Sequence, residues 1–163
     1  MFLDQVKAAM QNYFGADQKR IEHALQVSRF AEILLEYIDA DPQVTLASAY
    51  LHDIGIHEAE RKHGSCGGRF QEIEGPAIAR QILQGQAADE SFIETVCEIV
   101  GKHHTPAGVD SPEFRIIWDA DALVNLVDLL PGKSAEFITK TISRSMVTEA
   151  GFRMAMELYL PRP

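Results

Sequence analysis

The segment that decides the fold class is DQKRIEHALQVSRFAEILLEYI, residues 17–38. Its apolar side chains recur at spacings of three and four residues, which is the period of an α-helix with one buried face. They are Ile21, Ala24, Leu25, Val27, Phe30, Ala31, Leu34, Leu35 and Ile38. Further along the chain, a second helix is predicted over residues 42–54, because Pro42 suits a first helical turn and Gly55 can end a helix in the left-handed conformation.

The rest of the chain carries the same helical period. Helices are predicted over residues 76–83, 91–104, 112–130, 135–146 and 149–158. Ser91 and Glu94 have the spacing of a capping box, which marks a helix start. The polar stretch 58–65 predicts a solvated loop, and the glycine-rich stretch 64–68 predicts a mobile one. No segment alternates apolar and polar residues for long, so the expected fold class is all-α.

The length and composition are those of a single domain, residues 1–163. Of these residues, 46% are hydrophobic and 24% are charged, which is ordinary globular usage, and no repeat or linker divides the chain. The net charge of −9 would repel a phosphate backbone, which argues against extended nucleic acid as a partner. No stretch approaches the ~20 apolar residues of a membrane span, so no membrane partner is expected.

The amino terminus and the cysteines predict a cytoplasmic protein. Residues 1–10 include the acidic Asp4 and lack the basic and apolar regions of a leader. Cys66 and Cys97 are too few for a disulfide framework and do not form a C-x-x-C pair, so both thiols are expected to be reduced. The sequence does not decide whether two copies pair into a homodimer.

A histidine and an aspartate, His52-Asp53, end the predicted second helix, whose neighbouring side chains are apolar. Burying an unpaired carboxylate is costly, so Asp53 needs a cation or strong hydrogen-bond donors. A metal ion would supply the charge, and a hydrogen bond between the two side chains without an ion is the alternative. His23 lies on the apolar face of the first helix, where a histidine is usually a core residue, so by itself it indicates little.

A further aspartate, Asp121, lies in a predicted helix that is largely apolar. Its carboxylate would need a cation for the same reason as that of Asp53. Together, two imidazoles and two carboxylates are the kind of ligands that hold iron, manganese or zinc while leaving positions open to water. The sequence therefore predicts a metal site.

The order of these residues along the chain resembles that of a known family, the HD superfamily of metal-dependent phosphohydrolases. HDIG at residues 52–55 is a variant of the family's motif, and ADAL at residues 120–123 is the context in which its last aspartate commonly lies. The resemblance covers roughly residues 21–130. It implies an HD-domain helical bundle with a central metal site. The implied ligands are His23, His52, Asp53 and Asp121.

The resemblance also implies the cofactor, which is a divalent transition metal such as iron, manganese or zinc. Magnesium or nickel could replace it in vitro. Asp119 competes with Asp121 for the last ligand position, since the two are close in sequence but point to different helix faces. We assign the ligand role to Asp121 and expect Asp119 to be a helix-surface charge rather than a support for the ligands.

Three further residues decide whether one or two ions are expected. Glu74 precedes a Gly-Pro pair, where dinuclear relatives such as diadenosine polyphosphate hydrolases carry a histidine. His103 and His104 follow the apolar side of a predicted helix, and the His-Thr pair that ends at Thr105 resembles that of the same enzymes. We therefore predict that Glu74, His103 and His104 hold a second ion. The alternative is that Glu74 caps the next helix and that the two histidines bind substrate phosphate.

The resemblance implies a metal-dependent phosphohydrolase acting on a small phosphorylated substrate, with a nucleotide favoured. Asp53 would orient or deprotonate the attacking water, and Lys102 or His103 would stabilise the developing phosphoryl charge. Relatives that hydrolyse deoxynucleoside monophosphates often carry a glutamate three residues after the motif aspartate. Here that residue is Ile56, so their acid–base assignment does not transfer.

Two alternative functions stay open. Some members of the superfamily perform oxygenation at a mixed-valent diiron pair, which needs six protein ligands, and the glutamate at position 74 makes this the minority reading. The other alternative is a metal-binding or nucleotide-binding module without turnover. The presence of all four core ligands argues against a degenerate site, although ligands alone do not prove catalysis.

Overall fold

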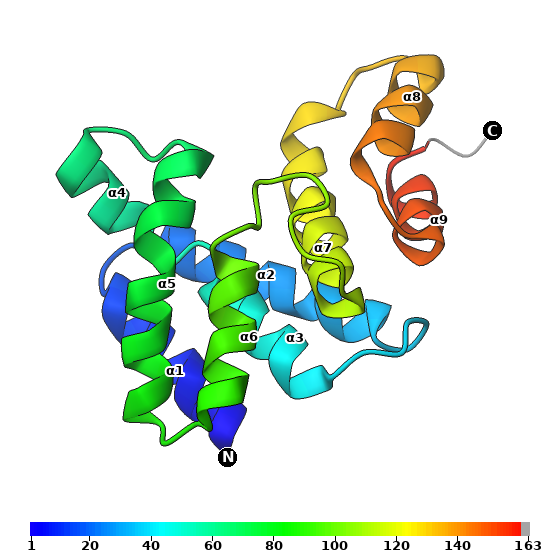
Figure 1. Ribbon diagram of the computed structural model, residues 1–163. Coiled ribbons are helices and arrows are strands. Elements are labelled where there is room, and N and C mark those ends of the chain that lie inside the picture. The colour runs from blue at the N-terminus through cyan, green and yellow to red at the C-terminus, as the bar shows by residue number, and fades with distance from the viewer. Residues whose placement is uncertain (161–163) are drawn as a thin grey trace.

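The computed structural model describes residues 1–160, and this part of the chain consists of helices joined by turns, with no strand (Figure 1). The all-α prediction is therefore confirmed. In chain order the helices are α1 (Phe2–Phe14), α2 (Gln18–Leu34), α3 (Pro42–Leu51), α4 (Ile56–His63), α5 (Gly68–Gly85), α6 (Glu90–Val100), α7 (Pro112–Leu129), α8 (Ala135–Ser145) and α9 (Glu149–Tyr159). No helix within residues 1–160 is long and apolar enough to cross a membrane.

Short polar side chains start several of the helices. Asp41 accepts hydrogen bonds from the backbone N–H groups of Gln43, at 2.8 Å, and Val44, at 3.0 Å, ahead of α3. Ser111 and Ser134 accept equivalent bonds ahead of α7 and α8. These side chains satisfy backbone donors that have no partner inside a helix, and they therefore fix where each helix begins.

Helix α2 lies at the centre of the bundle and packs against α3 and α7. Helix α3 also contacts α1, α6 and α7, while α5 pairs with α4 and α6. The core between them is apolar, and Val27 of α2, Leu51 of α3 and Leu123 of α7 are fully buried. Burial of side chains of this size contributes on the order of 1.5–3 kcal/mol each. This packing brings the first half of α2, the end of α3 and the middle of α7 to one place.

Two helices, α1 and α4, lie where none was predicted. Val6, Met10 and Phe14 of α1 recur every four residues and are buried, so the amino-terminal segment does carry the apolar period of a helix. Helix α4 replaces the predicted solvated loop, so that prediction is wrong. Ile56 and Ala59, three residues apart, are buried and hold this otherwise polar segment on the core as a helix.

Helix α5 begins at Gly68 rather than at Pro76, which lies inside the helix. A proline inside a helix removes one backbone hydrogen bond, and for this reason the predicted helix began at Pro76. The turn before the proline stays helical because it is held by packing, with Gln71 and Gly75 both buried. Glu74 is therefore in the middle of a helix and does not cap one.

The start of α6 also differs from the prediction. Asp89 occupies the position before the first helical residue, and the predicted capping box of Ser91 and Glu94 is not formed. Glu94 instead forms an ion pair with Arg80 of α5. An acidic side chain near a helix start has two uses, in a cap or in a pair with a neighbouring helix, and the sequence alone did not distinguish them.

Gly55, the last residue of HDIG, is not in the left-handed conformation that the sequence predicted, since its φ is −77°. A glycine is needed there for close packing instead. A Cβ on Gly55 would lie 2.6 Å from the backbone nitrogen of Gly75, and a Cβ on Gly75 would lie 2.8 Å from Cγ1 of Val100. The turn that carries His52 and Asp53 is thus held against α5 with no room for a side chain between them.

Candidate metal centre

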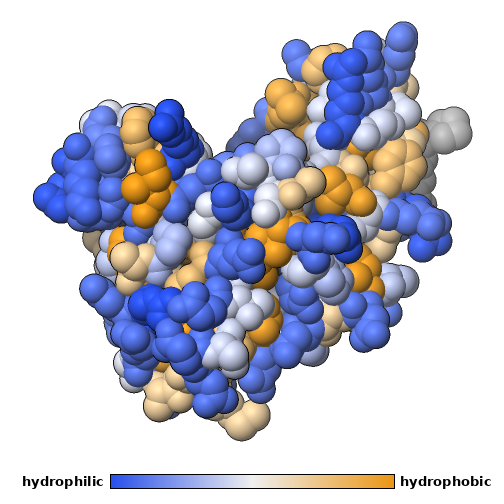
Figure 2. Space-filling view, in the orientation of Figure 1, coloured by the Kyte–Doolittle hydropathy of each residue, from blue (hydrophilic) through white to orange (hydrophobic). Residues whose placement is uncertain are grey.

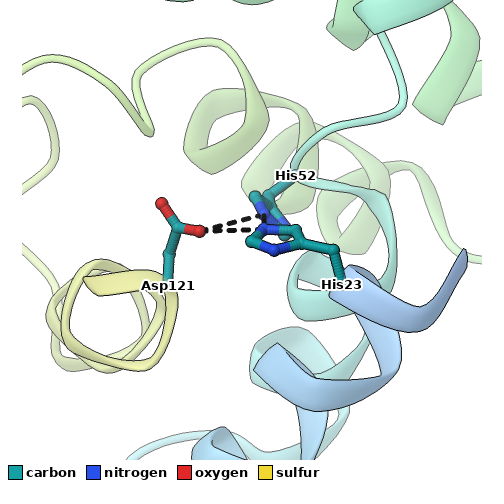
Figure 3. A group of neighbouring side chains, drawn as sticks. All are labelled: His23, His52 and Asp121. Carbon is teal, nitrogen blue, oxygen red and sulfur yellow. Dashed lines mark hydrogen bonds and ion pairs between the residues drawn. The ribbon is translucent and has the colours of Figure 1, made fainter. Parts of the chain in front are cut away.

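The side chains of His23, His52 and Asp121 converge from three helices of the core. In Figure 3 the two imidazoles and the carboxylate point toward one another from α2, from the end of α3 and from α7. Nε2 of His23 lies 3.0 Å from Oδ1 of Asp121, and Nε2 of His52 lies 3.7 Å from the same oxygen. The two Nε2 atoms are 3.3 Å apart. Three ligand-type atoms therefore surround one small volume.

The hydrogen bond at the far side of each buried imidazole decides which nitrogen faces this volume. Nδ1 of His52 donates to the carbonyl oxygen of Ala49 at 2.8 Å, and Nδ1 of His103 donates to that of Val100 at 2.7 Å. An imidazole that binds a metal ion is neutral, and with its proton on Nδ1 the lone pair on Nε2 is free to coordinate the ion. Both Nε2 atoms are therefore presented as metal ligands, in the arrangement that second-sphere hydrogen bonds usually impose.

Asp53 stands between this group and a second one, which consists of Asp53, His103 and His104. Its Oδ2 lies 3.5 Å from Nε2 of His23 and 3.6 Å from Nε2 of His52, while its Oδ1 lies 3.4 Å from Nε2 of His103. Nε2 of His103 is buried and has no hydrogen-bond partner among the described residues. A buried nitrogen of this kind needs a partner, and a metal ion beside Asp53 would be one.

The charges at the centre favour a cation. Burial lowers the pKa of His52, but the carboxylates of Asp53 and Asp121 outweigh it and raise the pKa to about 9. Burial raises the pKa of Asp53, but His52 and His103 outweigh it and lower the pKa to about 2. Hydrogen bonds from His23 and His52 likewise outweigh burial at Asp121 and hold the pKa of its carboxyl far below its usual range. The residues present therefore fit a divalent ion in both donor chemistry and charge.

Glu74 is not brought to either group. Its carboxylate accepts hydrogen bonds from Nζ of Lys62, at 2.7 Å, and Nε2 of His63, at 2.9 Å, both at the end of α4. The predicted set for a second ion is thus only partly gathered, because His103 and His104 are joined by Asp53 instead of Glu74. The reason is the unpredicted helix α4, which supplies two hydrogen-bond donors, Lys62 and His63, for Glu74.

A residue that the sequence did not single out, Gln71 of α5, lies beside the second group. Its side-chain Oε1 is 3.2 Å from Nε2 of His104, and its Nε2 donates to the carbonyl oxygen of Cys66 at 2.7 Å. Gln71 is buried, and a Cβ on Gly68, one helical turn earlier, would lie 2.6 Å from the His104 ring. In the sequence, only the helical spacing of Gln71 from Gly68 and Gly75 could have placed these residues on one helix face. That spacing is informative only if the helix begins at Gly68, and this start was not predicted.

Asp119 is fully buried, so its prediction as a helix-surface charge is wrong. Its carboxylate accepts hydrogen bonds from the backbone N–H groups of Val147, at 2.8 Å, and Thr148, at 2.9 Å. It also accepts one from the Thr148 hydroxyl at 2.6 Å. Burial raises the pKa of its carboxyl, and these three donors reverse only part of that rise. Asp119 fastens the connection between α8 and α9 to α7 and has no contact with the two ligand groups.

Two cavities open at the centre, in the hollow that Figure 2 shows between the lobe of α4 and α5 and the lobe of α7, α8 and α9. One, of about 460 Å³, is lined by His23, Asp53, His104 and Asp121 together with Lys19 and Arg20. The other, of about 390 Å³, lies between α7 and α8 and shares His104, Asp121 and Asn125 with the first. These volumes are in the range of small-molecule sites.

The cationic residues at the first cavity were not predicted. Lys19 and Arg20 precede His23 by one helical turn, so the helical period places them on its side of α2. Lys102, which was predicted to contact phosphate, is exposed and lines neither cavity. In this first cavity, the positive charge available to an anionic ligand therefore comes from α2 and not from the turn after α6.

Comparison with known proteins agrees with this geometry. The family model of the HD domain matches residues 20–126, about two thirds of the chain. A crystal structure of a predicted HD superfamily hydrolase from an uncultured Thermotogales bacterium is similar, with 27% sequence identity and a TM-score of 0.64 over 97% of this chain and 83% of that one. No curated protein matches the sequence. The chain belongs to the HD domain family.

Proposed function

We propose that the protein is a metal-dependent phosphohydrolase that acts on a small phosphoester, with a nucleotide as the favoured class. The observation that carries this proposal is the meeting of two groups of ligand-type side chains at Asp53, in a cavity that Lys19 and Arg20 also line. In a chain with a net charge of −9, two cations beside an acidic centre are suited to hold an anionic substrate. The description of the solved relative as a predicted hydrolase supports the reaction class.

When bound, a divalent ion would supply an activated water at neutral pH and stabilise negative charge on phosphoryl oxygens. The chain's own residues would orient the reactants. Asp53 turns one carboxylate oxygen toward each group, so it can accept a hydrogen bond from the attacking water and orient it. Arg20 and Lys19 would bind the phosphate oxygens, the role first assigned to Lys102.

Phosphate release from a panel of nucleotides and sugar phosphates tests this proposal. Protein purified without chelator should contain a transition metal, and chelation or Asp53→Ala should abolish release. Arg20→Ala should raise KM by about tenfold, as expected for the loss of a charge-assisted hydrogen bond. Arg29→Ala is the matched control, because Arg29 is exposed on the same helix and lines neither cavity, so its constants should not change. No turnover of the whole panel by metal-loaded protein would favour a non-catalytic module.

One observation favours a second candidate, the mixed-valent diiron oxygenase. The two groups together contain six ligand-type residues, which is the number that such a centre requires, and Glu74 is not needed among them. They are His23, His52, Asp53, His103, His104 and Asp121. Oxygen consumption by iron-loaded protein, together with an electron paramagnetic resonance signal of a mixed-valent pair, would distinguish this chemistry from phosphate release.

A further inference from the structure

The cavity between α7 and α8 has a different lining from the cavity that Lys19 and Arg20 line. It contains His103, His104 and Asp121 of the candidate centre and extends along α7 to the apolar side chains of Leu126 and Leu129. A substrate whose phosphate lies at the centre would therefore place its leaving group along a surface that is largely apolar.

Arg144, in the last turn of α8, also lines this cavity. Apart from the candidate ligands, it is the charged side chain of the lining. Arg144 is exposed at the cavity and, like Arg20 at the first cavity, forms no ion pair with any described residue. An unpaired guanidinium with five fixed donors is suited to bind a carboxylate or a phosphate in two-point geometry.

The chain directly after Arg144 is attached to α7 at two places. The indole Nε1–H of Trp118 donates to the carbonyl oxygen of Ser145 at 3.0 Å. Asp119, the next residue of α7, holds Val147 and Thr148 through three hydrogen bonds. The position of Arg144 along the cavity is therefore fixed by its backbone. Helix α8 lies beyond residues 20–126, so the segment that matches the family model does not contain this side chain.

We propose that Arg144 binds a second anionic group, a carboxylate or a phosphate, on the leaving group of the substrate. This inference rests on the proposed function and narrows its substrate class to phosphoesters that carry two anionic groups joined by an apolar or planar part. Hydrolysis would add water across the P–O bond and release inorganic phosphate and an alcohol that keeps the second anion. Arg144 acts on binding and specificity and takes no proton.

Direct binding tests the proposal without turnover. The chain has one tryptophan, Trp118, which lines this cavity, so its fluorescence reports a ligand there. The probes are benzylphosphonate, with one anionic group, and 4-carboxybenzylphosphonate and 1,4-xylylenebisphosphonate, with two, titrated into metal-loaded protein. The wild type should bind at least one two-anion probe about tenfold more tightly than benzylphosphonate. The tighter of the two identifies the second group as a carboxylate or a phosphate.

Variants then assign the effect to Arg144. Arg144→Ala should make the three dissociation constants nearly equal, and Arg144→Lys should restore only part of the difference, since an ammonium cannot make the two-point contact. Arg153→Ala is the matched control, because Arg153 is exposed on α9 and does not line this cavity. No preference in the wild type, or a preference that Arg144→Ala keeps, would overturn the proposal. A preference that depends on Arg144 in a protein that hydrolyses no phosphoester would overturn the proposed function alone.

Discussion

Two faces of α7 each withdraw a carboxylate from water and satisfy it in different ways, with Asp119 fully buried and Asp121 half-buried. On one face, Asp121 is surrounded by the imidazoles of His23 and His52, which are themselves ligand-type groups. On the other face, Asp119 accepts three hydrogen bonds from Val147 and Thr148. Removing a carboxylate from water is costly in both places. The difference teaches that burial alone does not identify a metal ligand, because protein donors can hold a buried carboxylate without an ion.

The largest effect is expected at the ligand side of this comparison, from Asp53→Ala. Asp53 belongs to one group and approaches the other within 3.6 Å, so its loss weakens both. Metal content by elemental analysis should fall below about a tenth of the wild-type value, because the site loses a charged ligand. Glu136→Ala removes an exposed carboxylate of α8 that belongs to neither group and lines neither cavity, so it should leave the content unchanged. Full occupancy in Asp53→Ala would contradict the assignment.

The next effect belongs to the hydrogen-bonded face. Asp119→Ala leaves the N–H groups of Val147 and Thr148 without their partner and should lower the free energy of unfolding by about 3 kcal/mol. Urea denaturation measures this change. The matched control, Asp128→Ala, should change stability by less than about 0.5 kcal/mol, since Asp128 is exposed. If the two variants were equally stable, the assignment of a structural role to Asp119 would be contradicted.

Gly151→Ala tests the contact between the start of α9 and the Asp119 carboxylate of α7. A Cβ at this position would lie 2.2 Å from Oδ2 of Asp119, so the carboxylate or the start of α9 must move. We expect a loss of about 1–3 kcal/mol in the free energy of unfolding, as for other overpacked sites. Gly85→Ala has open space around its Cβ and should be neutral or slightly stabilising. A neutral Gly151→Ala would show that the connection between α8 and α9 is not held tightly.

The smallest effect is expected at Glu74, and it sharpens the description of the second group. A saturating metal titration should stop at two ions in the wild type, and His104→Ala should reduce this to one. Glu74→Ala should still bind two, because the carboxylate is paired with Lys62 and His63. If Glu74→Ala bound only one ion, Glu74 would be a ligand of the second ion, and the assignment made here would be wrong.

Sequence periodicity was sufficient for the elements that build the centre. The helices that carry His23, His52 and Asp121 show strong apolar patterns, and each residue lies where such a pattern places it, beside the core. Helix α4 was missed because only Ile56 and Ala59 face the core in a segment that is otherwise polar. Short helices of this kind depend on tertiary packing more than on local pattern.

The residues that were missed or misplaced owe their roles to contacts between distant parts of the chain. The role of Asp119 comes from Val147 and Thr148, which lie beyond the helix that contains it. Nothing in the local sequence of α7 marks that contact. The same holds for Arg144, whose relation to the centre exists only once α8 packs against Trp118. Local sequence therefore predicts which face of a helix is buried, but not what meets it there.

The most direct test of the metal centre is the affinity of two nearly isosteric variants, Asp121→Asn and Asp119→Asn, for the same divalent ion. Each change removes one charge from one face of α7 and keeps the side-chain size. Competition against a fluorescent chelator should show a loss of about 100-fold in Asp121→Asn, because a charged ligand is removed. Asp119→Asn should bind within about threefold of the wild type, since Asp119 touches neither ligand group. Equal affinities in the two variants, or a larger loss in Asp119→Asn, would contradict the assignment of Asp121 to the metal centre.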